Sequence, residues 1–165
     1  MMAKKIETSK KLPVYGKLTA WLLTGIALVA GGVLFSQQPA EAADVVVYKS
    51  PTCGCCKDWV SHMKENGYTV EVHNQRNMSS IKTELGVPRN MQSCHTAKVG
   101  GYIIEGHVPA DVVARLLKEK PPIKGLAVPG MPMGSPGMEG PRKDPYNIVT
   151  IQENGKTTVY ASRNQ

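Results

Sequence analysis

The chain lacks the sequence features of a nucleic-acid-binding protein. Its 165 residues carry a formal net charge of +7, yet only 5% are aromatic, and no basic run interleaved with aromatics occurs. Part of the positive charge belongs to the N-terminal lysines, and charges of both signs alternate through the rest of the chain. These features predict a mildly basic, solvated surface and no nucleic-acid partner.

The N-terminal stretch lacks paired arginines, which would suggest twin-arginine export, and no cysteine near its apolar run suggests a lipid anchor. What it has is a basic stretch, Lys4 to Lys17, an apolar run from Leu18 to Phe35, and Ala40-Glu41-Ala42. This order is typical of a signal peptide ending in an A-x-A cleavage site, so residues 1–42 are predicted to be removed. The apolar run approaches the ~20 residues of a membrane helix, so an uncleaved anchor is the alternative, and membrane association is expected only in that case.

The remainder suits one compact domain. Its apolar patterns predict the order strand, helix, strand, helix, hairpin, helix. The first helix is expected to start in the cysteine cluster, capped by Ser50 or Thr52, and to stop at Asn66-Gly67. The last helix is expected to have Pro109 at its first position. The predicted elements are strands at 45–48, 68–72, 96–99 and 102–105, and helices from the cysteine cluster to 66, at 77–85 and at 109–120.

This order predicts an α/β fold, with a thioredoxin-like four-stranded mixed sheet and flanking helices over residues 43–120. Residues 121–145 hold seven prolines, five glycines and several methionines without apolar periodicity, and are predicted to form a Pro/Gly/Met-rich loop. A C-terminal β-hairpin is predicted at 146–161, turning at Asn154-Gly155 and packed on the same domain. Because regular structure resumes there, the loop is held at both ends and can fold back over the domain.

Four cysteines in a chain with an export signal leave three possible roles: disulfides, redox chemistry or a soft-metal site. Cys53 and Cys56 have C-x-x-C spacing where a strand gives way to a helix, and the positive end of the helix dipole favours thiolates there. Cys55 adds a third thiol inside the motif. If all four were paired, Cys53–Cys56 with Cys55–Cys94 is sterically the least strained of three connectivities.

In a thioredoxin, the loop entering the third strand would hold a cis-proline facing the motif. Here it reads Gln92-Ser93-Cys94-His95-Thr96. On the predicted fold, Cys94 and His95 therefore point toward Cys53 and Cys56, and clustered thiolates with an imidazole form a soft-metal pocket. Zinc remains an alternative. Copper is preferred because thioether sulfur is a good ligand for Cu(I). Met131 and Met133 lie in the loop, where no apolar periodicity predicts that they are buried in the core.

Four motifs carry a resemblance to a known family. They are Tyr48-Lys-Ser-Pro-Thr-Cys-Gly-Cys-Cys-Lys-Asp-Trp59, Ser93-Cys-His-Thr-Ala97, Gly101-Tyr-Ile-Ile-Glu-Gly-His-Val-Pro-Ala110 and the segment from Gly125 to Met138. In this order they resemble the exported, thioredoxin-like metal-binding family that includes the copper-resistance protein CopG. The resemblance implies a periplasmic location, copper as the bound ion, and Cys53, Cys55, Cys56 and Cys94 as ligands. We also predict His95 as a metal ligand, because it adjoins Cys94, and we consider His107, Met131 and Met133 further candidate ligands.

The preferred function is thus a periplasmic copper-binding protein holding Cu(I) at a site that can be polynuclear and redox-active, cycling between Cu(I) and Cu(II). By family analogy, its partners are copper ions and a periplasmic copper chaperone or efflux component. One alternative is a thiol–disulfide oxidoreductase of exported proteins using Cys53 and Cys56. Another is a disulfide-stapled interaction module. A binding protein is preferred over an enzyme, with copper or thiol redox activity as the alternative.

Overall fold

The computed structural model describes residues 44–165. The predicted signal peptide, its cleavage site and the alternative membrane anchor lie outside these residues. Among the helices within them, none combines the length and the apolar character required to cross a membrane.

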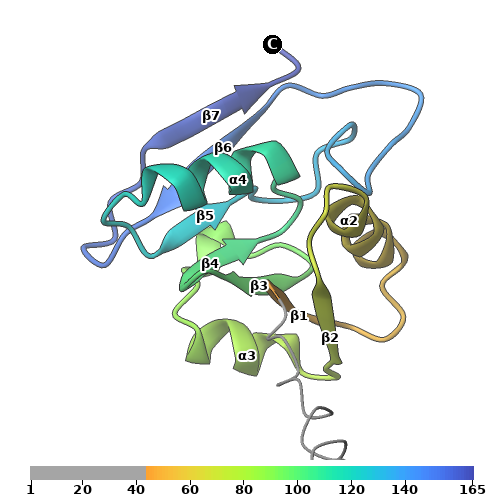
Figure 1. Ribbon diagram of the computed structural model, residues 1–165, viewed down its shortest axis with the longest axis horizontal. Helices are drawn as coiled ribbons and strands as arrows, with labels where there is room; N and C mark the ends of the chain where they lie inside the picture. The colour runs from red at the N-terminus through yellow and green to blue at the C-terminus, as the bar shows by residue number, and fades with distance from the viewer. Residues whose placement is uncertain (1–43) are drawn as a thin grey trace, which may run out of the picture. The chain divides into compact units, whose positions relative to one another are not determined.

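The described residues form a mixed α/β fold built on one seven-stranded sheet (Figure 1). The strands lie in the order β2-β1-β3-β4-β5-β6-β7, with β1–β2 and β4–β5 parallel and the other neighbours antiparallel. Their bounds are β1 Val45–Lys49, β2 Val70–Asn74, β3 Thr96–Val99, β4 Tyr102–Glu105, β5 Gly125–Ala127, β6 Tyr146–Ile151 and β7 Val159–Arg163.

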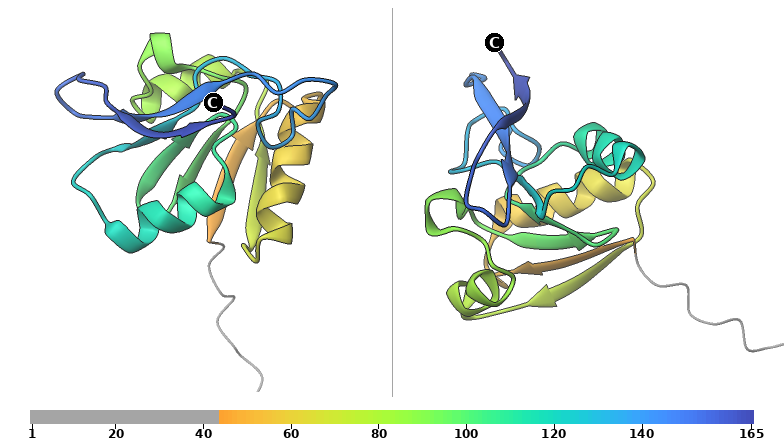
Figure 2. Two further views of the ribbon diagram at one scale, coloured as in Figure 1. Left: turned by 90° about the horizontal axis from the view of Figure 1, so that it is seen from above. Right: turned by 90° about the vertical axis from the view of Figure 1, so that its left-hand side faces the viewer.

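Within the described part of the chain, three α-helices flank the sheet: α2 Gly54–Glu65, α3 Met78–Glu84 and α4 Ala110–Glu119, with a 3₁₀ turn, η2, at Arg89–Met91. Helices α2 and α4 lie on one face, and α3 lies on the other (Figure 2). Buried side chains of α2 and α4, such as Trp59 and Leu116, pack with Val47 and Ile104 of the strands into the main core. A smaller cluster around Met91 and Ile103 fills part of the opposite face.

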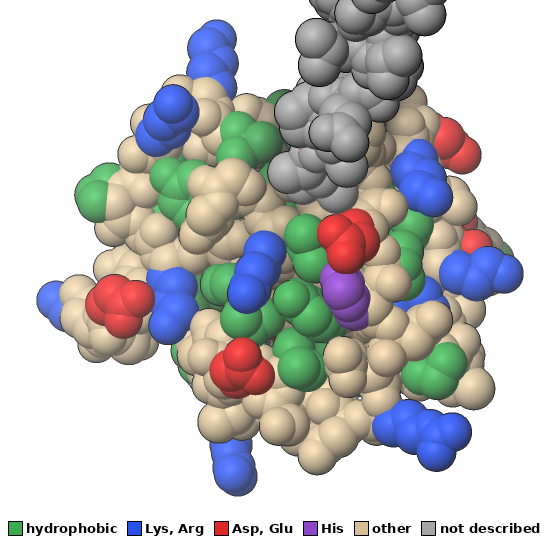
Figure 3. All heavy atoms as spheres, turned by 60° about the horizontal axis from the view of Figure 1, so that its bottom comes forward, with side chains coloured by type: hydrophobic (Ala, Val, Ile, Leu, Met, Phe, Trp, Pro, Cys, Tyr) green, Lys and Arg blue, Asp and Glu red, His purple; other side chains and the backbone are tan. Residues whose placement is uncertain are grey.

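On the face shown in Figure 3, Lys, Arg, Asp and Glu side chains are interspersed around a central group of hydrophobic ones. Val72 of the edge strand β2 is the most exposed large apolar residue of that strand, at 38%. Oppositely charged neighbours elsewhere on the surface, such as Arg142 and Asp144, fit the mixed surface that the sequence predicts.

The sheet is larger than the four strands predicted from the sequence. The first four strands have the predicted directions, but β5 lies within the segment predicted to be loop and joins β4 to β6, so the C-terminal hairpin continues the same sheet. Gly125 makes this pairing possible, because a Cβ there would lie 1.8 Å from the carbonyl oxygen of Ile103. A strand of three residues is too short to show periodicity, and only six residues separate the flanking Pro122 and Pro129, so the sequence pattern did not predict β5.

The helix boundaries also differ in detail. The N-cap of α2 is Cys53 rather than Ser50 or Thr52, with its Sγ accepting from the backbone N–H of Cys56. Pro109 is the N-cap of α4 rather than its first helical residue. The predicted stop at Asn66-Gly67 is confirmed, with Gly67 at φ +88°.

Candidate metal centre

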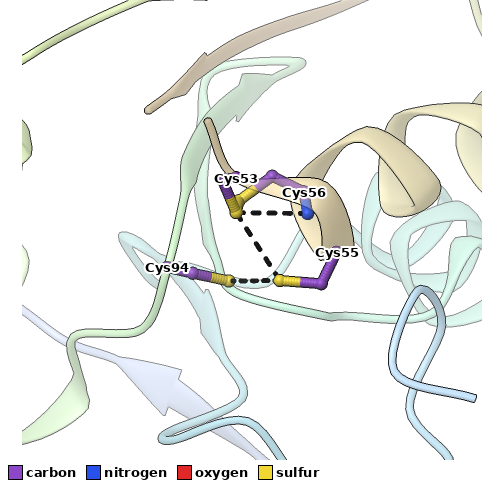
Figure 4. Close-up of side chains that lie close together, drawn as sticks. All are labelled: Cys53, Cys55, Cys56 and Cys94. Carbon is purple, nitrogen blue, oxygen red and sulfur yellow. Dashed lines mark hydrogen bonds between the residues drawn. A yellow bond between two sulfur atoms is a disulfide. The ribbon is translucent and has the colours of Figure 1, made fainter. Parts of the chain in front are cut away.

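Three cysteines, here called the helix half of the site, lie at the N-terminus of α2. Cys53 and Cys56 form a disulfide, and Cys55 is a free, half-buried thiol (Figure 4). The Sγ atoms of Cys53 and Cys55 lie 3.5 Å apart. The C-x-x-C spacing produces this grouping locally, since the first turn of the helix brings residue 56 back over residue 53.

Three further residues, the strand half, come from the ends of β3 and β4: Cys94, His95 and His107. Cys94 is a free thiol whose Sγ lies 3.9 Å from that of Cys55, across a separation of 39 residues. The four cysteine sulfurs lie within 4.8 Å of one another, and so do the ligand atoms of Cys94, His95 and His107. Cys94 belongs to both groups and therefore links the two halves.

The ring of His107 is fixed by two contacts. Its Nδ1 lies 2.7 Å from the carbonyl oxygen of Pro136, and its Nε2 lies 2.8 Å from Sγ of Cys94. A carbonyl can only accept, so Nδ1 carries the proton and Nε2 presents its lone pair to Cys94. Metal-ligating histidines are commonly oriented in this way, by a carbonyl bound to the second ring nitrogen.

His95 is buried between Trp59 and His107, with ring centroids 4.4 and 5.0 Å away. Its Nδ1 lies 3.6 Å from Sγ of Cys94, and its Nε2 has no hydrogen-bond partner among residues 44–165. A buried ring nitrogen without a partner costs free energy, and such groups are uncommon away from functional sites.

Burial sets the protonation of this half. It raises the pKa of Cys94 to about 12, helped by the neighbouring Cys55, so the metal-free thiol keeps its proton at neutral pH. Burial also lowers the pKa of His107, and it lowers that of His95 well below the usual value, with His107, Lys82 and Lys49 adding to the effect. Both imidazoles are therefore neutral and able to act as ligands.

A buried carboxylate orders the loop that carries Cys94. Glu105 accepts from the backbone N–H of Ser93 at 2.6 Å, from Nζ of Lys82 at 2.5 Å and from the hydroxyl of Thr96 at 2.6 Å. Glu105 and Lys82 are almost fully buried. Because Ser93 adjoins Cys94 in the chain, this network fixes the backbone from which the thiol projects.

Lys49 is a second buried lysine, at the end of β1. Its Nζ donates to the carbonyl oxygen of Ser50, which also accepts from the backbone N–H of Cys53. Continuing the β1–β3 register by one residue places Lys49 opposite His95. Two lysines and one glutamate thus lie buried close to the site, and both lysines disfavour a charged ring on His95.

The Pro/Gly/Met-rich segment covers the helix half. A Cβ on Gly137 would lie 2.6 Å from the carbonyl oxygen of Cys55 and 2.7 Å from the backbone nitrogen of Trp59, so only glycine permits this approach. Ser93 donates from its hydroxyl to the carbonyl oxygen of Gly130, joining the segment to the Cys94 loop. The segment thus folds back over the domain, as its anchored ends suggest.

The predicted site residues divide into those the structure assembles and those it leaves apart. Six of them converge: Cys53, Cys55, Cys56, Cys94, His95 and His107. Met131 borders Cys94 in a shared pocket. Met133 packs instead near Gly140, and its backbone N–H donates to Asp144.

Sequence reasoning missed Glu105, Lys82 and Lys49. Glu105 lies inside one of the four quoted motifs, where a carboxylate at the end of an apolar strand could have drawn attention. Lys49 and Lys82 gave no such signal, since a lysine at a strand end or on a short helix usually reaches solvent.

Comparisons with known proteins identify the family of the chain. Two solved structures, both named copper resistance protein CopG, resemble the chain. One, described as Form 2, has 46% identity and a TM-score of 0.69 and covers 74% of this chain and 98% of its own. The other, Form 1, has 44% identity and a TM-score of 0.70 and covers 76% and 100%. The chain belongs to the CopG family.

A family model described as a protein of unknown function, DUF411, also matches residues 91–138. This stretch includes the strand half of the site and most of the Pro/Gly/Met-rich segment. Among curated proteins, no sequence matches the chain. Membership of the CopG family is therefore shown by the two solved structures, which the match covers over 98% and 100% of their length.

Proposed function

We propose that the protein binds copper as Cu(I) through the cysteine cluster and serves copper resistance or homeostasis in the periplasm. The observation that carries this proposal is four cysteine sulfurs within 4.8 Å of one another, beside two neutral imidazoles. Thiolate and imidazole are ligands that Cu(I) accepts readily. The printed names of the two CopG structures support copper as the ion.

Binding by all four sulfurs requires the reduced protein. Breaking the Cys53–Cys56 bond takes two electrons and two protons and gives two thiols. Each thiol then loses its proton when it ligates the metal. In the reverse direction, re-forming the disulfide releases two electrons, enough to reduce two Cu(II) ions to Cu(I). We propose this coupling of disulfide formation to Cu(II) reduction as the redox activity of the site.

The site is proposed to be polynuclear, because Cys94 belongs to two ligand groups. One group is the four cysteines and the other is Cys94, His95 and His107. Thiolate sulfur can bridge two metal ions, so the sulfur of Cys94 is placed to join one ion held by the helix half to another held by the strand half. Zinc is the less favoured ion, since a closed tetrahedral site would use four of these ligands and leave the rest idle.

The fold supports the same proposal. Strands β2-β1-β3-β4 with α2, α3 and α4 have the connections and directions of a thioredoxin-like core, and we infer that residues 43–120 form one. Such a core would present the C-x-x-C motif at a helix N-terminus. Copper ions, and a periplasmic copper chaperone or efflux component, remain the proposed partners.

An anaerobic Cu(I) titration tests the proposal. The protein is compared in two states, with Cys53–Cys56 oxidised and with all four thiols reduced, and the copper-to-protein ratio is measured after removing free metal. We expect the reduced protein to hold more than one Cu(I) tightly and the oxidised protein to hold fewer. Equal, weak binding in both states would show that the cysteines are not the copper ligands.

A thiol–disulfide oxidoreductase is the second candidate, favoured by the disulfide at the N-terminus of α2. Cys53, partly exposed, would be the attacking thiol and the buried Cys56 the resolving one. Disulfide reduction by the metal-free protein, measured on a model protein disulfide, tests this function. Rapid turnover that Cys94→Ser leaves unchanged would favour it over copper binding.

A further inference from the structure

A pocket of about 240 Å³ reaches Cys94 from the surface. It is lined by Gln92, Ser93, Cys94, Gly130 and Met131. Cys94 is the single member of the cysteine cluster that lines it. The hydrogen bond from the Ser93 hydroxyl to the Gly130 carbonyl joins its two walls, so the pocket is formed before any ligand arrives.

Met131 and Met133 lie two residues apart but have different surroundings. Met131 is 55% exposed and shares the pocket with Cys94. The side chain of Met133 lies against Gly140, and its backbone N–H is bound by Asp144. A single exposed apolar side chain needs no explanation by itself. The shared pocket with a free thiol is the feature that sets Met131 apart.

The chemistry of this pair suits transient binding. A thioether is a soft, uncharged ligand that binds Cu(I) without losing a proton. It binds more weakly than a thiolate, so an ion held first by Met131 gains free energy by moving on to the cysteines. Its flexible side chain can also follow the ion during the transfer.

We propose that Met131 and Cys94 form a capture site, at which Cu(I) from a soluble donor is first held before it reaches Cys53, Cys55 and Cys56. The inference rests on the proposed Cu(I) binding and adds a route to it. Met131 thus governs the rate of loading, whereas the cluster governs the amount and the final affinity.

The test measures loading rates on the reduced full-length protein by stopped flow. The probe is Cu(I) held by bicinchoninate, whose colour disappears as copper leaves it. Met131→Leu removes the thioether at nearly constant volume, Met133→Leu is the matched control, and Met131→His supplies a different Cu(I) ligand. Met131 is exposed, and Leu nearly matches Met in volume at the half-buried Met133, so none of these changes is expected to disturb folding.

We expect Met131→Leu to slow loading about tenfold. Loss of a group that supports a metal site lowers metal affinity or activity by about 10- to 100-fold, and the lower figure applies to a single weak ligand. Met133→Leu should load at the parent rate, Met131→His should keep most of it, and all variants should reach the same final copper content. Parent-rate loading by Met131→Leu, or equal slowing by Met133→Leu, would overturn the capture site and leave copper binding intact. Failure of the parent itself to take up Cu(I) would instead overturn the proposed function.

Discussion

The two halves of the site are built in different ways. Cys53, Cys55 and Cys56 of the helix half are neighbours in the chain, and a single helical turn groups them. Cys94, His95 and His107 of the strand half come together only when β3 and β4 pair in register, Thr96 opposite Glu105. The helix half therefore depends on local geometry, and the strand half depends on the folded sheet.

This difference assigns them different parts in the proposed chemistry. The helix half can open and close a disulfide without help from the rest of the fold. The strand half holds neutral imidazoles and a protonated thiol in fixed positions beside a buried ion pair. We therefore expect changes in the strand half to affect metal binding and stability together, and changes in the helix half to affect metal binding more selectively.

The largest effect is expected from Cys94→Ser. Cys94 is shared by both ligand groups, so its loss should lower the affinity for Cu(I) by about 100-fold or more and reduce the copper-to-protein ratio. Cys53→Ser is the matched comparison, since it removes a sulfur from one group only. Competition with a Cu(I) chelator measures both. If Cys53→Ser costs as much as Cys94→Ser, the bridging position of Cys94 is wrong.

Glu105→Gln should be the most destabilising change in the metal-free protein. It leaves Lys82 buried without its carboxylate, which costs about 3–5 kcal/mol for a buried pair. The double change Lys82→Met with Glu105→Gln should recover much of this loss. Urea unfolding measures all three proteins. Asp111→Asn, which breaks the exposed pair with Arg163, is the control and should cost at most about 1 kcal/mol. A Glu105→Gln variant as stable as Asp111→Asn would contradict the role given to the buried pair.

Gly137→Ala tests how closely the Pro/Gly/Met-rich segment packs against the helix half. The new methyl would meet backbone atoms of Cys55 and Trp59, so the Pro/Gly/Met-rich segment must move away from α2, at a cost of about 1–3 kcal/mol. Gly155 also has a positive φ but faces open space, so Gly155→Ala isolates the backbone strain. We expect Gly137→Ala to be the less stable and the faster to release Cu(I). Equal stability of the two variants would mean that the segment does not press on the helix.

These contrasts also explain what the sequence revealed. The strand before the cysteines, the helix after them and the hairpin of β3 and β4 are set by local sequence patterns, and the structure contains all three as predicted. The convergence of Cys94 on Cys53 and Cys56 followed from the predicted topology. Strand β5 and the seven-stranded sheet depend on pairing between distant segments, and three residues cannot show a period.

The site shows the same limit. Cysteines in a C-x-x-C motif are visible in any sequence, but the contact of His107 with Pro136 is set by the path of the covering segment. The burial of Lys82 likewise depends on Glu105, which lies 23 residues away. Met131 and Met133 are equivalent in the sequence, and only the folded segment separates them.

The smallest effect is a shift of stability with pH in the metal-free protein. The pKa values of His62, His95 and His107 lie below the ordinary 6.5, chiefly because burial disfavours the charged ring. Below that pH the unfolded chain binds more protons than the folded one. The stability these groups confer is therefore complete above pH 6.5 and is lost as the pH falls through their folded values.

The pH dependence also distinguishes His62, which lies outside both halves of the site, from the two histidines of the strand half. His62 lies on α2 and accepts from the backbone N–H of Ala110, whereas His95 and His107 belong to the strand half. Urea midpoints of the metal-free protein, measured across the range below pH 6.5, should fall as the pH falls. His107→Gln should flatten this dependence more than His62→Gln, because the strand half holds its rings away from water more completely. A midpoint that rises on acidification, or a steeper dependence in His107→Gln, would show that these rings are charged in the folded protein.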